Sequence, residues 1–160
     1  MKIKAQKKLS EKRNETRSPV CIESNKQRIQ ILTSEMEQLK ERECRLAERL
    51  IAEQPLVNEL RSNPRFLKEE DRLLLSALVD DIYNNFTVRL TTRFPNLTEV
   101  DIQYCILLKF HFSVPQVAIL SAISRTSVYQ QKARIKKRLL LMDPNLFING
   151  ETLDAWLHKF

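Results

Sequence analysis

The chain has 160 residues and a formal net charge of +7 at pH 7, and its only glycine is Gly150. One glycine is too few for the tight turns of a β-rich protein, and it excludes the clustered glycines of a Walker loop or a dinucleotide-binding turn. Leucine and the charged helix formers are abundant instead, so we expect an all-α fold.

Positive charge is concentrated in two clusters. Residues 1–17 hold seven lysines and arginines against two glutamates, and residues 125–138 hold six with no acidic residue. Two such clusters on an otherwise mildly acidic chain favour an anionic partner, above all nucleic acid. We interpret residues 1–24 as a disordered basic tail that either keeps the protein in solution or binds that anion.

The sequence predicts a cytoplasmic protein without a membrane span. No apolar run approaches the roughly 20 residues of a membrane helix, and the basic N-terminus lacks the apolar segment of a signal peptide. Cys21, Cys44 and Cys105 are odd in number and widely spaced. That usage is typical of a reducing compartment and not of a disulfide framework.

A coiled-coil helix is predicted over residues 25–62. From Asn25 to Glu53, apolar residues recur at alternating spacings of three and four, the a and d positions of a heptad, and Pro55 ends or kinks the helix. The seam could join two copies in a parallel dimer, or it could be one face of an amphipathic helix that folds back on its own chain. The predicted dimer seam is Ile29, Leu32, Met36, Leu39, Leu46 and Leu50.

A connecting amphipathic helix is predicted over residues 65–96, with its helical body from Lys68 to Arg93. Its apolar face is wider than a coiled-coil seam, which indicates burial against the rest of the fold or a second subunit. Three acidic residues stand in its first turn, where they complement the helix dipole, and Pro95 stops it.

Residues 97–142 show three helix starts at short intervals. Thr98 with Asp101, and Ser113 with Gln116, have the spacing of capping boxes, and Ser124 can cap the third helix. The middle helix is too short to stand alone, so all three must pack together. In the third helix, Val128, Ile135 and Leu139 form one inward stripe, and the remaining positions are polar or basic.

This ordered set resembles the LuxR-type helix-turn-helix, the C-terminal output domain of many bacterial regulators. The matching residues are Leu97, Thr98, Ser113, Gln116, Val117, Ala118, Ile123, Ser124, Ser127, Val128, Lys137, Arg138 and Leu139. The chain departs from the family where His111 replaces glycine, Ser121 replaces an apolar residue and Gln116 replaces an acid. A further similarity is to the segment that precedes this domain in a subset of those regulators, and it rests on Tyr83, Phe86, Leu90 and residues 94–98.

The resemblance implies a site on the third helix. Tyr129, Gln130 and Ala133 would face base edges in the major groove, where Gln130 could pair with adenine. The residues implied to hold the phosphate backbone are Arg125, Ser127, Lys132, Arg134, Lys136 and Lys137.

We predict that residues 143–160 form a C-terminal tail with a short helix from Thr152 to His158. A lone tryptophan beside leucines is usually a packing side chain, so we expect Trp156 to dock on the fold rather than stack on a base.

No catalytic residue, metal ligand or cofactor is expected. His111 and His158 are far apart in the sequence and lack a cysteine or acid at ligand spacing, which argues against a metal site. Asp80 and Asp81 are adjacent on a helix and do not face one another, so they are not an acid/base pair.

These features favour a cytoplasmic bacterial transcription regulator that binds double-stranded DNA as a homodimer and acts with the transcription machinery or a sensor protein. One alternative is a coiled-coil interaction adaptor with a degenerate helix-turn-helix. Another is a promoter reader similar to a sigma factor, which the absence of a second promoter-binding domain disfavours.

Overall fold

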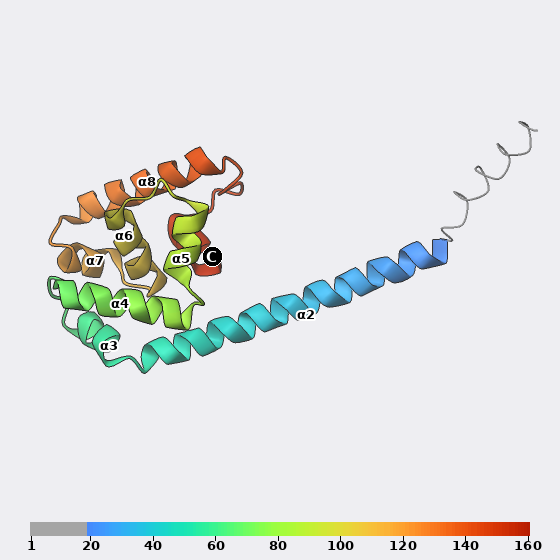
Figure 1. Cartoon of the computed structure of the whole chain (residues 1–160), viewed down its shortest axis with the longest axis horizontal. Helices are drawn as coiled ribbons and strands as arrows, with labels where there is room; N and C mark the ends of the chain where they lie inside the picture. Colours follow the sequence, from blue (N-terminus) through green and yellow to red (C-terminus); the bar gives the residue numbers. More distant parts are fainter. Residues whose placement is uncertain (1–18) are drawn as a thin grey trace, which may run out of the picture. The chain divides into compact units, whose positions relative to one another are not determined.

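The structure is a computed structural model that describes residues 19–160. All regular structure in this range is α-helical, which confirms the predicted fold class. The chain divides into two units between Leu46 and Ala47. The helices are α2 (Pro19–Ala52), α3 (Pro55–Ser62), α4 (Glu69–Ile82), α5 (Phe86–Arg93), α6 (Glu99–Lys109), α7 (Val114–Leu120), α8 (Arg125–Met142) and α9 (Leu153–Lys159) (Figure 1).

Helix α2 begins earlier than the heptad pattern predicted. It starts at Pro19, so residues 19–24 are helical and their assignment to a disordered tail was wrong; residues 1–18 of that tail lie outside the described residues. Proline is well tolerated in a first helical turn because its missing N–H has no helical partner there. At the other end α2 stops at Ala52 and α3 starts at Pro55, so the predicted break is confirmed.

The predicted helix from Lys68 to Arg93 is two helices. The chain turns between α4 and α5 through Asn84 and Asn85, which have left-handed φ angles of 51° and 55°. Asparagine adopts this conformation more readily than most residues. The Asp80 carboxylate accepts hydrogen bonds from the Thr87 backbone N–H (2.7 Å) and from the Thr87 hydroxyl (2.6 Å). The first of these bonds satisfies a backbone N–H in the first turn of α5 that has no partner within the helix. The apolar spacing continues across the turn, so periodicity could not reveal it.

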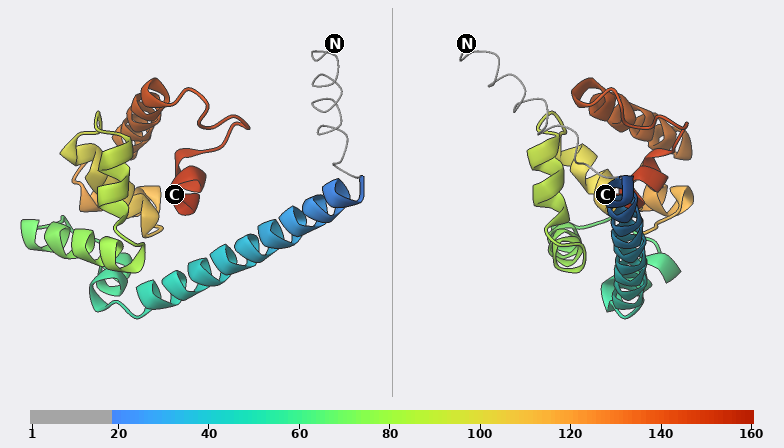
Figure 2. Two further views of the ribbon diagram at one scale, coloured as in Figure 1. Left: turned by 45° about the vertical axis from the view of Figure 1, so that its right-hand side comes forward. Right: turned by 90° about the vertical axis from the view of Figure 1, so that its right-hand side faces the viewer.

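Helix α6 lies at the centre of the unit that begins at Ala47. It contacts α4, α5, α8 and α9 (Figures 1 and 2). Every residue from Tyr104 to Lys109 is buried, as expected of a helix that is covered on all sides.

A buried carboxylate ties α6 to α8. Asp101 is fully buried and accepts a hydrogen bond from the Thr98 backbone N–H at 2.8 Å, which forms the predicted capping box. It also accepts from the Gln131 side-chain amide at 2.8 Å and pairs with the Arg138 guanidinium. Because removing a partner from a buried charge is costly, these contacts fix the register of α8 on α6.

A buried cation ties α6 to α9. The Lys109 ammonium donates to the backbone carbonyls of Leu157 (2.8 Å) and His158 (3.1 Å), and it lies 4.4 Å from the centre of the Tyr83 ring. A cation at the carboxyl end of a helix satisfies carbonyls that lack helical partners. None of the helices in residues 19–160 is long and apolar enough to cross a membrane.

Candidate nucleic-acid interface

Helices α7 and α8 lie side by side and begin at the caps that the sequence predicted (Figure 1). The Ser113 hydroxyl accepts from the Gln116 backbone N–H, and the Gln116 side chain accepts from the Ser113 backbone N–H at 2.8 Å. The Ser124 hydroxyl accepts from the Ser127 backbone N–H at 3.1 Å. These contacts fix the first turns of both helices.

The turn between α7 and α8 depends on a left-handed residue. Ala122 has a φ of 54°, its N–H donates to the Ile119 carbonyl at 3.1 Å, and the Ile123 N–H donates to the Ala118 carbonyl at 2.9 Å. This pattern closes the end of α7 and lets the chain turn sharply into α8. His111, before α7, is also left-handed with a φ of 60°, a conformation that glycine adopts more readily than histidine.

The inward stripe of α8 is confirmed. Val128, Ile135 and Leu139 are fully buried, so the rotation of α8 about its axis is the one that the sequence predicted. Ser121, at the end of α7, is half-buried, and its backbone N–H donates to the Val117 carbonyl at 2.9 Å. The polar side chain at this position is therefore compatible with a closed helix end.

The opposite side of α8 is an exposed strip. Tyr129, Gln130 and Ala133 are all exposed, and the Tyr129 side chain is 60% accessible. The cations on this side are Arg125, Arg134 and Lys137, all exposed and without an ion-pair partner among residues 19–160. We call these six residues the α8 strip. Ser127 is half-buried, with its hydroxyl 2.8 Å from that of Ser124.

Lys132 and Lys136, which were also predicted to bind phosphate, are on α8 but are not part of the α8 strip. Lys132 forms an ion pair with Asp154 of α9. The Lys136 ammonium donates to the Glu151 backbone carbonyl at 2.9 Å and lies 4.7 Å from the centre of the Phe147 ring. The C-terminal segment, residues 143–160, therefore holds both lysine side chains. The structure does not bring these two lysines together with the α8 strip. The sequence could not reveal this, because the partners lie 15 to 22 residues away.

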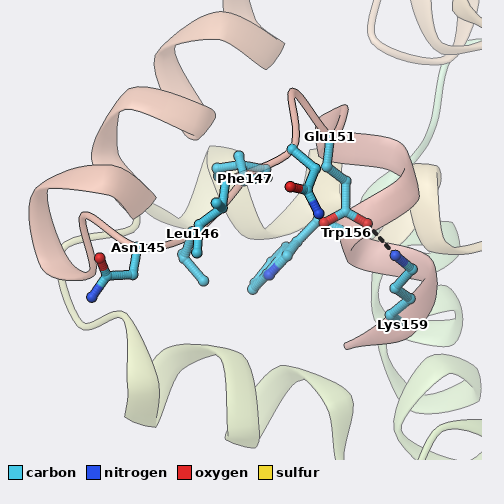
Figure 3. Close-up of a pocket in the computed structure, with 8 residues that line it drawn as sticks. Asn145, Leu146, Phe147, Glu151, Trp156 and Lys159 are labelled. Atoms are coloured by element: carbon cyan, nitrogen blue, oxygen red, sulfur yellow. Dashed lines mark hydrogen bonds and ion pairs between the residues drawn. The ribbon is translucent and has the colours of Figure 1, made fainter.

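The C-terminal segment packs through the tryptophan, as expected. The Trp156 ring centre lies 5.7 Å from that of Phe94, 5.8 Å from that of Phe147 and 5.0 Å from that of Phe160. Beside it is a shallow pocket that Phe147, Trp156 and Lys159 line, with Lys159 paired to the Glu151 carboxylate (Figure 3). We assign this segment a structural role, because its aromatic rings pack on one another.

The two histidines meet, contrary to the expectation from their sequence separation. The ring centres of His111 and His158 are 4.0 Å apart. Partial burial lowers the pKa of both imidazoles; the charge of His158 lowers that of His111 further, and the charge of Lys109 lowers that of His158. No group of three or more His, Cys, Asp or Glu residues in the described part of the chain could hold a metal ion.

Of the three cysteines, Cys105 lies in the core as predicted, and burial raises the pKa of its thiol. Cys21 and Cys44 are exposed on α2.

Comparisons of the chain with protein-family models, with curated proteins and with solved structures found no match.

Proposed function

We propose that the protein is a cytoplasmic transcription regulator that reads duplex DNA with the α8 strip. The observation that carries the proposal is that three exposed cations without an ion-pair partner among residues 19–160 lie with exposed Tyr129, Gln130 and Ala133 on one side of a helix capped by Ser124. A single α-helix fits the major groove, and cations along its edges can contact phosphates on both sides.

Within this proposal the residues have separate roles. Gln130 can form a bidentate contact with adenine, while Tyr129 and Ala133 can contact thymine methyl groups. Arg125, Arg134 and Lys137 would neutralise phosphates, which gives affinity without sequence preference.

The packing of the C-terminal segment changes the role that we propose for Lys132 and Lys136. Lys132 is already paired and largely buried, with a side chain that is 17% exposed, and Lys136 donates to a backbone carbonyl. Both therefore act as positioning residues that hold α8 to the C-terminal segment. Their removal should alter DNA binding less than removal of Arg134 or Lys137.

Fluorescence anisotropy with duplexes across a salt series tests the proposal. The duplexes would be fragments selected by the protein from a genomic library, with scrambled versions for comparison. Arg134→Ala and Lys137→Ala should weaken binding to both kinds equally, and each should lower the slope of log affinity against log salt by about 1. Lys159→Ala, which removes an exposed cation outside α8, is the matched control and should leave the slope unchanged.

Gln130→Ala should act differently. Loss of a bidentate base contact should narrow the gap between selected and scrambled duplexes by roughly 1–3 kcal/mol and leave the salt slope in place. Absence of binding to any duplex at low salt would overturn the proposal.

A second candidate function is that of an interaction adaptor. Exposed apolar side chains outside α8 favour it, among them Phe66, Leu73 and Leu74 at and near the start of α4. A pure protein contact has no need of the three exposed cations of the α8 strip, so we rank this function second. A sigma-like promoter reader has no further observation in its favour.

A further inference from the structure

Helix α2 presents a largely apolar stripe to solvent, with Asn25 and Glu43 as its polar positions. The six predicted seam side chains are each 46 to 63% exposed. Because α2 starts at Pro19, Ile22 joins the same stripe one heptad before Ile29, and it is 48% exposed. A stripe of this length on a single helix is costly to leave in water, because apolar surface is more stable when it is removed from water.

We propose that the occupant of this stripe is the α2 helix of a second copy, parallel and in register. The heptad places β-branched Ile22 and Ile29 at a positions and Leu32, Leu39 and Leu46 at d positions. That distribution favours two parallel strands over higher oligomers. The inference concerns α2 alone and does not depend on DNA binding by α8.

The charges beside the stripe agree with this arrangement. In a parallel, in-register pair, a g residue faces the e residue five positions later in the second copy. Glu35 at g then faces Lys40 of the second copy, and the symmetry of the dimer gives this attractive pair twice. Arg28 at g faces Thr33 of the second copy. No two like charges meet across these positions.

Two polar residues in the stripe select the register. Asn25 stands at d and Glu43 at a, and in register each meets its own counterpart. A shift by one heptad would place Glu43 opposite an apolar Met36 or Leu50, which leaves a charge against an apolar side chain. In register, Arg42 of the second copy, at the g position before a, lies beside Glu43 and offsets the repulsion between the two carboxylates.

The antiparallel arrangements are disfavoured. One of them places Asn25 opposite Glu43 and keeps the apolar layers intact, with Ile29 opposite Leu39. Antiparallel pairs bring g residues together and e residues together, so this register sets Arg28 against Arg42 and Lys26 against Lys40. Like charges at these positions are destabilising. The antiparallel register centred on Met36 and Leu39 instead sets Glu43 against Leu32.

Disulfide crosslinking of the full chain distinguishes the orientations. In a background with Cys21→Ser and Cys44→Ser, the single variants Ile29→Cys and Leu39→Cys would be oxidised separately and as a mixture of tagged and untagged chains. A parallel, in-register dimer should crosslink each variant to itself and give no disulfide between the two variants. In the antiparallel register that pairs Ile29 with Leu39, identical cysteines would be about 15 Å apart along the axis, so only the mixture would crosslink.

A charge exchange tests the register independently. Glu35→Lys alone, or Lys40→Glu alone, should raise the dimer dissociation constant by roughly tenfold in analytical ultracentrifugation, since two attractive pairs become repulsive. The double variant with both changes should restore the wild-type value. Glu37→Lys is the matched control, because Glu37 is exposed on α2 away from the stripe.

Each outcome has a definite meaning. Self-crosslinking together with restoration by the double variant supports the proposal. A wild-type monomer at high micromolar concentration, crosslinking only in the mixture, or no restoration by the double variant overturns it. Because none of these measurements uses DNA, the result is separate from the test of the α8 strip.

Discussion

Individual residues carry strain in this chain that glycine would relieve. Its only glycine, Gly150, has a positive φ of 69°, and the turns elsewhere use other residues. The non-glycine residues with positive φ in the described range are Asn84, Asn85, His111, Ala122 and Phe147. A left-handed conformation costs most L-residues roughly 1–2 kcal/mol and costs asparagine less, so His111, Ala122 and Phe147 are held in it by the packing around them.

Ala122 offers a test of this strain. We expect Ala122→Gly to stabilise the fold by about 0.5–1 kcal/mol. Removal of the Cβ relieves strain in the folded state, and this gain should exceed the cost of the greater conformational entropy that glycine has in the unfolded chain. Ala133→Gly makes the same chemical change at an exposed position within α8 and should destabilise by roughly 0.5–1 kcal/mol. Urea unfolding compares the two, and a loss of stability at Ala122 would contradict the assigned turn.

At the scale of the helix, α8 has two sides with separate tasks. Its inward stripe packs on the core, and its outward strip carries the candidate DNA contacts. Residues of intermediate exposure between the two, Gln131 and Arg138, hold α8 to Asp101 of α6. The sequence pattern did not predict a partner for Arg138; that partner is a buried carboxylate 37 residues earlier.

Ile135 tests the rotation of α8. This side chain is fully buried, so Ile135→Ala should lower the free energy of unfolding by roughly 2–4 kcal/mol. Leu141 lies on the same helix but is 72% exposed, and Leu141→Ala should change stability by less than about 0.5 kcal/mol. Equal effects in urea unfolding would mean that the inward stripe is misassigned.

Local signals predicted the three capped helix starts of residues 97–142 better than they predicted the turn before α5 or the partners of the α8 cations. Thr98, Ser113 and Ser124 act on backbone groups three residues away, so a short stretch of sequence contains the whole interaction. The turn at Asn84 interrupts a helix whose apolar spacing continues across it. The pairing of Lys132 with Asp154 is set by tertiary packing, which spacing along one helix does not contain.

At the scale of the whole chain, residues distant in sequence close the unit that begins at Ala47. Helix α9 packs on α6, and its carboxyl end is held by Lys109. His158 of α9 meets His111, which lies between α6 and α7. The docking of α9 therefore places two titratable rings in contact, and we expect its stability to depend on pH.

The direction of that dependence follows from the lowered pKa values. Burial, first, and then neighbouring positive charge make both imidazoles bind a proton more weakly in the folded chain than in the unfolded chain; Glu48 opposes this at both rings, and Asp154 opposes it at His158. Because the unfolded chain binds more protons, stability is lost as the pH falls below the unfolded value of about 6.5 and continues to fall until the folded groups titrate.

Urea unfolding of the wild type and of the variant with His111→Gln and His158→Gln, at pH 7.5 and pH 5.0, checks this expectation. The chain has only these two histidines, and most carboxylates titrate below this range, so the double variant should lose most of the pH dependence. The wild-type midpoint should be lower at pH 5.0, because protonation places charge on two partly buried rings and then sets those rings against each other beside Lys109. An equal fall in midpoint for both proteins would show that the histidine contact does not govern the docking of α9.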